Sequence, residues 1–91
     1  INTMTSDDNF HLEKVLTHVK ISFQKCFKND TIDIDTDFFE LGGDSLQAQK
    51  ICLLLEQYFS IIIHPSLLFE YSCPRTLAEY LIGKIFPNKF L

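Results

Sequence analysis

Apolar residues recur every three or four positions along the first third of the chain, the spacing of one face of a helix. Polar residues 6–8 can cap such a helix, and Asn29 and Asp30 can end it. We therefore predict a first helix between them. Its apolar positions are Leu12, Val15, Leu16, Val19, Phe23, Cys26 and Phe27.

A second helix is predicted to begin at Asp44 and Ser45 and to end near Tyr58 or Phe59. Asp44, followed three residues later by Gln47, is the pattern of a capping box. At about 100° per residue, one side of this helix gathers a set of apolar residues that should face the core. These are Ala48, Ile51, Cys52, Leu55 and Phe59.

Leu46 and Leu53 fall on the opposite side of that helix, one heptad apart, among polar residues such as Gln57. A helix that has already buried one apolar face gains little for folding from a second apolar pair. The plain interpretation is that they are ordinary surface leucines, which are common in proteins. The alternative is that the two leucines contact another protein.

The last third of the chain predicts one short helix and one long one. Residues 65–66, Pro-Ser, can begin a turn of helix with apolar residues 67–69. No strand pairing is required anywhere. The sequence therefore predicts an all-α fold, with three long helices, one short helix and a long connection between the first two.

Two starts compete for the last helix, which carries Leu77, Tyr80, Leu81 and Ile85. Pro74 suits the first helical position, whereas Thr76 and Glu79 also form a capping-box pattern. We favour Pro74, because Thr76 can also sit inside a first turn. Pro87 is expected to stop this helix.

The connection of residues 29–44 is long for a segment without helical periodicity, and such segments are often functional. Its apolar residues should pin it onto the helices: Ile32, Ile34, Phe38 and Phe39. Asp33, Asp35 and Asp37 alternate as in a calcium loop. An EF-hand also needs a glycine and a glutamate in fixed register, which Gly42 and Glu40 do not provide. We predict no metal site.

Composition and charge exclude several classes of function. The chain has 91 residues, suits one domain, and its 46% hydrophobic content can supply a core. Its net charge of −4 argues against nucleic-acid binding, which needs Lys and Arg to neutralise phosphates. The apolar run of residues 61–63 falls far short of the roughly 20 residues of a membrane span, as does every other apolar run in the chain. A chain of this size favours a binding module over an enzyme.

The cysteines and the N-terminus suggest a cytoplasmic domain. Three widely spaced cysteines suit reduced thiols better than a disulfide framework or a zinc site. The polar start lacks the features of a secretion signal. We expect residues 1–8 to be a flexible linker, 9–86 the domain and 87–91 a tail. The cysteines are Cys26, Cys52 and Cys73.

The string around Ser45 is the most informative part of the sequence. Gly42 and Gly43 permit backbone angles closed to other residues and leave room for a partner. Ser45 follows at the start of a helix, where free N–H groups and the positive dipole end favour a phosphate ester. The plain alternative is that Ser45 is only part of a helix cap, but a cap alone does not explain the glycines or the outward leucines.

A hydrolase with Ser45 as nucleophile is a remote alternative. Residues 43–46, Gly-Asp-Ser-Leu, spell the signature of the GDSL hydrolases, and Asp8 and His11 even supply an Asp-x-x-His pair. In that family, however, the pair follows the serine on a much larger α/β scaffold. A nucleophile elbow would need glycine where Gln47 stands, and His64, the histidine nearest in sequence, is at the far end of the helix.

Residues 37–46, Asp-Phe-Phe-Glu-Leu-Gly-Gly-Asp-Ser-Leu, closely resemble the core motif of phosphopantetheine-binding carrier domains, especially the peptidyl carriers of nonribosomal peptide synthetases. The similarity continues through Ala48, Ile51 and Leu55, then residues 68–71 and 77–81, and covers roughly residues 12–85. Two features depart from the common pattern. Residues 72–73 are Ser-Cys where many relatives have Pro-Thr, and Asp44 stands where many peptidyl carriers have histidine.

The resemblance implies an acyl-carrier-like four-helix bundle that catalyses nothing itself. A phosphopantetheinyl transferase would move a 4′-phosphopantetheine arm from coenzyme A onto Ser45, beside Gly43 and Asp44. Aminoacyl, peptidyl or acyl cargo would then be shuttled as a thioester between adenylation, condensation, thioesterase or ketosynthase-type domains. A polyketide or fatty-acyl carrier is the alternative within the class. We expect the excised domain to be monomeric.

In such families, partners dock on the second long helix and the loop before it. The resemblance therefore assigns the outward side chains of this region to a predicted docking surface. Its residues are Leu46, Gln49, Lys50 and Leu53, with Phe38 or Leu41 contributing from the loop.

Overall fold

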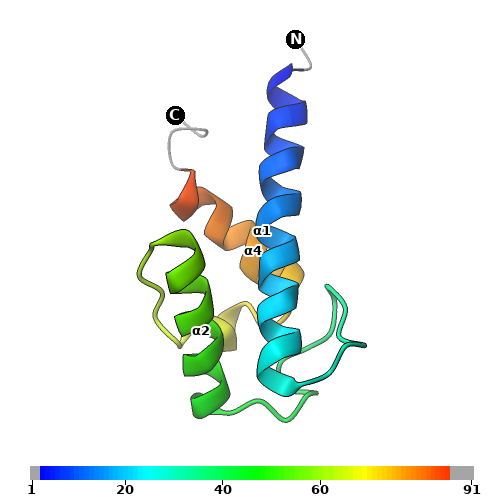
Figure 1. Ribbon diagram of the computed structural model, residues 1–91, viewed down its shortest axis with the longest axis vertical. Coiled ribbons are helices and arrows are strands. Elements are labelled where there is room, and N and C mark those ends of the chain that lie inside the picture. The colour runs from blue at the N-terminus through cyan, green and yellow to red at the C-terminus, as the bar shows by residue number, and fades with distance from the viewer. Residues whose placement is uncertain (1–2, 87–91) are drawn as a thin grey trace.

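A computed structural model describes the backbone of residues 3–86 and the side chains of residues 11–86. This part of the chain forms four helices, in agreement with the predicted all-α fold of three long helices and one short helix (Figure 1). The predicted tail, residues 87–91, and the effect of Pro87 lie outside the described residues. The helices are α1 (Thr3–Phe27), α2 (Ser45–Phe59), α3 (Leu67–Glu70) and α4 (Pro74–Ile85).

Helices α1 and α2 run in opposite directions, so the end of α1 and the start of α2 lie at the same end of the bundle (Figure 1). The start of α1 and the end of α4 lie towards the opposite end. α1 packs against both α2 and α4. None of the helices in the described part of the chain is long and apolar enough to cross a membrane.

One continuous core joins all four helices and the connections between them. The face of α2 predicted to be apolar is buried as expected, apart from Phe59, which is only partly covered. Each fully buried aliphatic side chain contributes about 1.5–3 kcal/mol to folding. The buried apolar residues are Val15, Val19, Phe23, Ile32, Phe38, Ala48, Ile51, Cys52, Leu55, Ile63, Leu68, Leu77, Ala78 and Leu81.

Helix α1 begins earlier than the sequence predicted. Its backbone is helical from Thr3, so the presumed capping residues 6–8 lie inside the helix, and the predicted linker of residues 1–8 is helical from residue 3 onward. The physical reason is that residues 3–8 contain no glycine or proline, so nothing in this segment interrupts the helix.

The start of α4 agrees with the preferred prediction. Pro74 is its first residue, after Cys73 as the N-cap. Thr76 lies inside the first turn, where its hydroxyl donates to the Cys73 carbonyl at 3.2 Å. α3 is likewise the short helix that residues 65–69 predicted.

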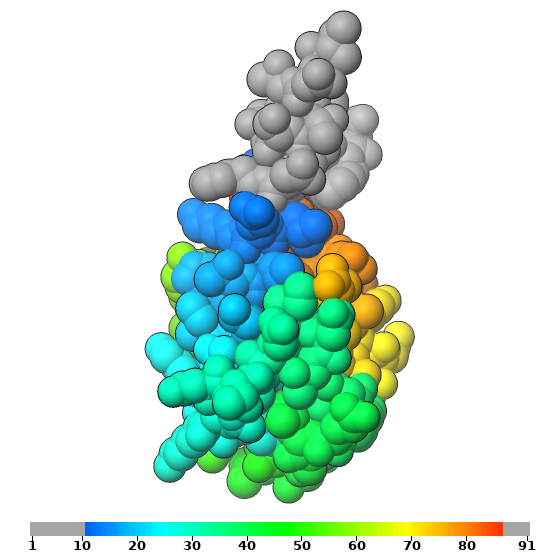
Figure 2. Space-filling model, turned by 90° about the vertical axis from the view of Figure 1, so that its right-hand side faces the viewer, coloured from blue at the N-terminus to red at the C-terminus, as the bar shows by residue number. Residues whose placement is uncertain are grey.

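The connection of residues 29–44 is fastened to the segment between α3 and α4 and to the start of α4. The Phe38 N–H donates to the Ser72 carbonyl, and the Arg75 N–H donates to the Ile34 carbonyl at 2.9 Å. The Ser72 hydroxyl donates to the Asp37 carboxylate at 2.8 Å. Figure 2 shows the connection spread over one face of the molecule, between α1 and the start of α4.

The alternating aspartates each have a structural partner within the domain. Asp33 accepts from the Ile34 N–H at 2.7 Å, and Asp35 pairs with Arg75 through two hydrogen bonds of 2.7 and 3.0 Å. Asp37 also accepts from two N–H groups of the following turn. Turn formation and tethering therefore explain the alternation. Among the described residues, no three His, Cys, Asp or Glu side chains are arranged to hold a metal ion.

Asp37 makes the stability of the domain depend on pH. The hydrogen bond from Ser72, followed by those from the N–H groups of Glu40 and Phe39, lowers the pKa of Asp37 below its ordinary value of about 3.8. Because the folded carboxyl binds its proton less readily than the unfolded one, its stabilisation is present above pH 3.8 and is lost as the pH falls through the folded pKa.

We therefore expect Asp37→Asn to lower stability at pH 6 and to reduce the loss of stability between pH 6 and pH 3. Urea unfolding at both pH values measures this. Asp30→Asn is the control, because Asp30 is exposed and its carboxylate accepts no hydrogen bond within the described part of the chain. Equal pH dependence in Asp37→Asn and wild type would contradict the assignment.

Candidate functional site

Ser45 is the first residue of α2 and its side chain is exposed. The predicted capping box is formed around it. The Asp44 carboxylate accepts from the Gln47 N–H, and the Gln47 side-chain carbonyl accepts from the Asp44 N–H, both at 3.1 Å. The cap orders the backbone on either side of Ser45 while leaving the serine itself at the surface.

Two backbone donors remain free at this helix start. The Asp44 and Gln47 N–H groups are used by the capping box, and the Ala48 N–H donates to the Asp44 carbonyl at 2.9 Å. In the described structure, the Ser45 and Leu46 N–H groups donate to no protein acceptor. Free N–H groups at the positive end of a helix suit a phosphate. A phosphodiester on the Ser45 oxygen therefore fits this place.

The two glycines before Asp44 have different structural roles. Gly42 has φ +78°, a left-handed conformation that strains other residues, and a Cβ there would meet open space. A Cβ on Gly43 would come within 2.5–2.6 Å of the Phe38 ring. Gly42 therefore makes the turn, and Gly43 permits close packing on a buried aromatic ring.

Phe38 is the centre of an aromatic cluster that supports this turn. Its side chain is 0% exposed. Four rings meet it edge-to-face at centroid distances of 5.6–6.3 Å: Phe23, Phe27, Phe39 and Phe69. The position of the Gly-Gly turn, and hence of Ser45, depends on a ring buried in the core.

A double-mutant cycle tests this dependence. Phe38→Ala should cost about 3–5 kcal/mol of unfolding free energy, and Gly43→Ala about 1–3 kcal/mol, because the added methyl displaces the ring. Combined, they should cost less than their sum by about 1 kcal/mol or more, because the methyl enters the space the ring leaves. Denaturant unfolding measures all three.

Gly42→Ala provides the control for this cycle. Its cost arises from backbone strain, so truncating Phe38 should not relieve it. Additive effects of Gly43→Ala and Phe38→Ala would mean that the close approach of residue 43 to the ring does not determine the turn. Phe38→Leu replaces Phe38→Ala if the alanine variant does not fold.

The three histidines of the chain are engaged in contacts within the bundle. His11 stacks on Phe86 with ring centroids 4.0 Å apart, and His18 stacks on Tyr58 at 3.6 Å. His64 Nδ1 lies 2.8 Å from the Ser66 hydroxyl oxygen. The Asp44 carboxylate is used in the helix cap. These contacts give no support to the hydrolase alternative; the side chain of Asp8, its other element, lies outside the described residues.

The outer face of α2 matches the predicted docking surface in exposure. Leu46 is 59% exposed and Leu53 is 55% exposed. Gln49 and Lys50 are also exposed, and Leu41 of the preceding loop is half-buried.

Phe38 is the exception, and its assignment to the docking surface is wrong because its ring is fully buried. The exposed aromatic residue of the loop is Phe39, which is 50% exposed and stacks on Phe69 of α3 with centroids 5.7 Å apart. Sequence reasoning missed Phe39, because an irregular loop has no periodicity that separates an inward residue from its outward neighbour. Gly43 and Asp44 directly precede Ser45 in the chain, and their part in holding the cofactor stays a prediction.

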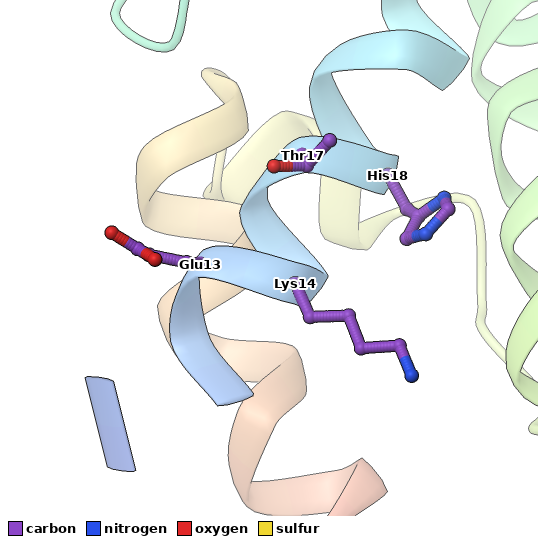
Figure 3. Close-up of a pocket in the computed structure, with 4 residues that line it drawn as sticks. All are labelled: Glu13, Lys14, Thr17 and His18. Atoms are coloured by element: carbon purple, nitrogen blue, oxygen red, sulfur yellow. The ribbon is translucent and has the colours of Figure 1, made fainter. Parts of the chain in front are cut away.

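The remaining candidate features, a surface hollow and the three cysteines, do not include Ser45. A shallow hollow on α1 is lined by Glu13, Lys14, Thr17 and His18, with no residue from the Ser45 region (Figure 3). The three cysteines are free thiols. Burial raises the pKa of Cys52 to about 11, so this thiol stays neutral in the core.

Comparison with known proteins identifies the class. The fold resembles the structure of BlmI, a type-II acyl-carrier protein from Streptomyces verticillus involved in bleomycin biosynthesis, with a TM-score of 0.83, 16% identity, and coverage of 88% of this chain and 96% of that one. This likeness concerns the fold: an acyl-carrier-like helical bundle.

The sequence comparison is more specific. A family model described as "Phosphopantetheine attachment site" matches residues 23–81, well over half of the chain. The chain therefore belongs to the family of phosphopantetheine-binding carrier domains, a non-catalytic family whose cofactor is phosphopantetheine.

The curated relatives include both polyketide synthases and nonribosomal peptide synthetases. The chain is 33% identical over 75 residues to the pikromycin polyketide synthase component PikAII of Streptomyces venezuelae, a match that covers 82% of this chain and 2% of that protein. It is 29% identical over 68 residues to tyrocidine synthase 3 of Brevibacillus parabrevis, covering 75% of this chain and 1% of that protein. The chain thus spans only a small part of these relatives.

Proposed function

We propose that Ser45 carries the phosphopantetheine arm, and that the domain presents cargo on this arm to partner enzymes of nonribosomal peptide or polyketide biosynthesis. The observation that supports the proposal is the exposed Ser45 hydroxyl at a capped helix start, beside the free N–H groups of Ser45 and Leu46. When bound, the arm supplies a terminal thiol that holds the cargo as a thioester.

The described residues around Ser45 position this group, and the transferase supplies the base. The Ser45 oxygen forms the new bond to phosphorus while the bond from that phosphorus to the nucleotide part of coenzyme A breaks. The hydroxyl proton is taken by the transferase. Asp44 and Gln47 keep the helix start ordered, and the free N–H groups can donate to the phosphodiester oxygens. Gly42, where a Cβ would meet open space, leaves room beside the attachment point for the transferase.

Within the class, we propose a peptidyl carrier of a nonribosomal peptide synthetase, with a polyketide or fatty-acyl carrier as the alternative. The motif of residues 37–46 supports the first, whereas the PikAII relative keeps the second open. Loading distinguishes them. An adenylating enzyme should load the first kind, and an acyltransferase the second.

The proposed partners are the phosphopantetheinyl transferase and adenylation, condensation, thioesterase or ketosynthase-type domains. We propose that they meet Leu46, Gln49, Lys50 and Leu53 of α2, with Leu41 contributing from the loop. The setting would be the cytoplasm, where coenzyme A and the transferase occur together. The excised domain is proposed to be monomeric.

Incubation with coenzyme A and a broad-specificity phosphopantetheinyl transferase tests the attachment site. Intact mass should rise by one phosphopantetheine group per chain, and peptide mapping should place this group on the peptide that contains Ser45. An unchanged mass after exhaustive incubation of folded protein, or a group mapped to another residue, would contradict the proposal.

A further inference from the structure

A second feature lies beside the proposed docking surface, where the end of α1 meets α2. The side chains there enclose a shallow hollow of about 320 Å³. We name it the lysine hollow. Its lining consists of Lys25, Cys26, Lys28, Lys50, Leu53 and Leu54.

All the charged residues that line the lysine hollow are cationic. Lys25, Lys28 and Lys50 are three of only eight Lys and Arg residues in a chain whose net charge is −4. In the described part of the chain, Arg75 and Asp35 form the only ion pair, so none of the three ammonium groups is paired. The hollow is a local concentration of uncompensated positive charge on an acidic protein.

Two of these lysines have a structural role within α1. Lys25 lies in its last turn and Lys28 directly follows it, where a cation complements the negative end of the helix dipole. Lys50 has no comparable structural role, because it lies inside α2 and the residues three and four positions away from it are uncharged. These neighbours are Leu46, Gln47, Leu53 and Leu54.

Asp44 is an acidic side chain close to this region, and its carboxylate is already engaged. The charge of Asp44 is felt at Cys26, but its carboxylate is held by the Gln47 N–H in the cap of α2. Asp44 also does not line the hollow.

The rest of the lining is apolar. Leu53 is 55% exposed, and Leu54 is partly exposed beside it. The Cys26 thiol donates to the Gln47 carbonyl at 3.6 Å, and burial raises its pKa, so it adds no negative charge. Unpaired ammonium groups around exposed leucines complement an apolar side chain flanked by carboxylates.

We propose that the lysine hollow binds an acidic segment of a partner protein, with an apolar side chain on Leu53 and Leu54 and carboxylates near the three lysines. The inference rests on the proposed function and refines it, because Leu53 belongs to both surfaces and lies about 12 Å along α2 from Ser45. Partners that approach Ser45 would thus be selected by negative charge.

The test is an NMR titration of the isotope-labelled domain. The first probe is a synthetic peptide in which one leucine is flanked by glutamates; in the second, lysines replace the glutamates. The glutamate peptide should cause saturable shifts at the amides of Lys25, Lys28, Lys50 and Leu53, and the effect should weaken at high salt. The lysine peptide should leave these amides unchanged.

Charge-reversal variants give the matched comparison. Lys50→Glu should weaken binding of the glutamate peptide by roughly fivefold or more, whereas Lys50→Arg should retain it. Lys84→Glu is the control, because Lys84 is an exposed lysine in the last turn of α4 that does not line the hollow. Equal losses in Lys50→Glu and Lys84→Glu, or no shifts at the hollow, would overturn the proposal.

A third probe tests whether the lysine hollow binds a nucleotide instead of a protein segment. Adenosine 3′,5′-bisphosphate represents the nucleotide end of coenzyme A, which also carries negative charge. Saturable shifts at the hollow with this nucleotide and none with the glutamate peptide would overturn the proposed protein partner. Transferase modification of the wild-type domain, read by intact mass, reports separately on the attachment site. If the domain is modified at Ser45 but does not bind the glutamate peptide, only the proposal for the lysine hollow is rejected. If it binds the peptide but is never modified, only the attachment proposal is rejected.

Discussion

The Ser45→Ala variant will take up no phosphopantetheine from coenzyme A, while its fold remains intact. The reason is chemical, because in the proposed attachment the ester oxygen is the hydroxyl oxygen that this substitution removes. The exposed Ser45 side chain donates to no acceptor in the described structure, and the cap of α2 depends on Asp44 and Gln47. Because alanine is also a good helix former, the free energy of unfolding should change by no more than about 0.5 kcal/mol.

Intact mass after exhaustive transferase treatment and thermal unfolding followed by circular dichroism measure the two effects. Ser66→Ala is the matched control, since Ser66 is also an exposed serine at a helix start and should not affect uptake. Uptake by Ser45→Ala equal to wild type would refute Ser45 as the attachment residue. Loss of uptake together with loss of helicity would instead indicate a structural role.

A charge on either side of α2 should have opposite consequences. Ile51 is fully buried, so Ile51→Asp places an unpaired carboxylate in the core and should cost at least about 4 kcal/mol. A loss of this size approaches the total stability of a small domain. We therefore expect Ile51→Asp to be largely unfolded. Leu53→Asp, two residues later on the exposed face, should remain folded with a nearly unchanged helical spectrum.

The effect of Leu53→Asp should appear in function instead. Leu46→Asp and Leu53→Asp should each slow modification or cargo transfer by roughly fivefold or more, as expected when an anchoring residue of an interface is lost. Gln57→Asp adds the same charge to an exposed position farther along α2 and should have no such effect. If both leucine variants work at wild-type rates, the docking surface on α2 is wrong.

The elements with regular periodicity could be predicted from sequence. The buried and exposed sides of α2 followed from the 100° rotation per residue, because packing against one core favours a single apolar face. The start of α2 followed from Asp44 and Gln47, and the start of α4 from Pro74. These signals are local, since each cap involves residues three or four positions apart.

The features that the sequence did not reveal depend on contacts between distant residues or on irregular backbone. Arg75 pairs with Asp35 across 40 positions, and Ser72 with Asp37 across 35. No local pattern shows that Phe38 points inward and Phe39 outward, or that Gly43 must pack on the Phe38 ring. The lysine hollow likewise arises where two helices meet.

The start of α1 and the end of α4 lie at the end of the bundle away from Ser45 (Figure 1). A tether to a neighbouring domain at either of these helix ends would therefore hold the bundle on the side remote from Ser45, the proposed attachment residue. Rotation about such a tether would carry Ser45 along an arc whose radius is the length of the bundle. The proposed arm would extend this reach further. The helices would then act as a rigid lever, and longer flanking linkers would widen the range of enzymes within reach.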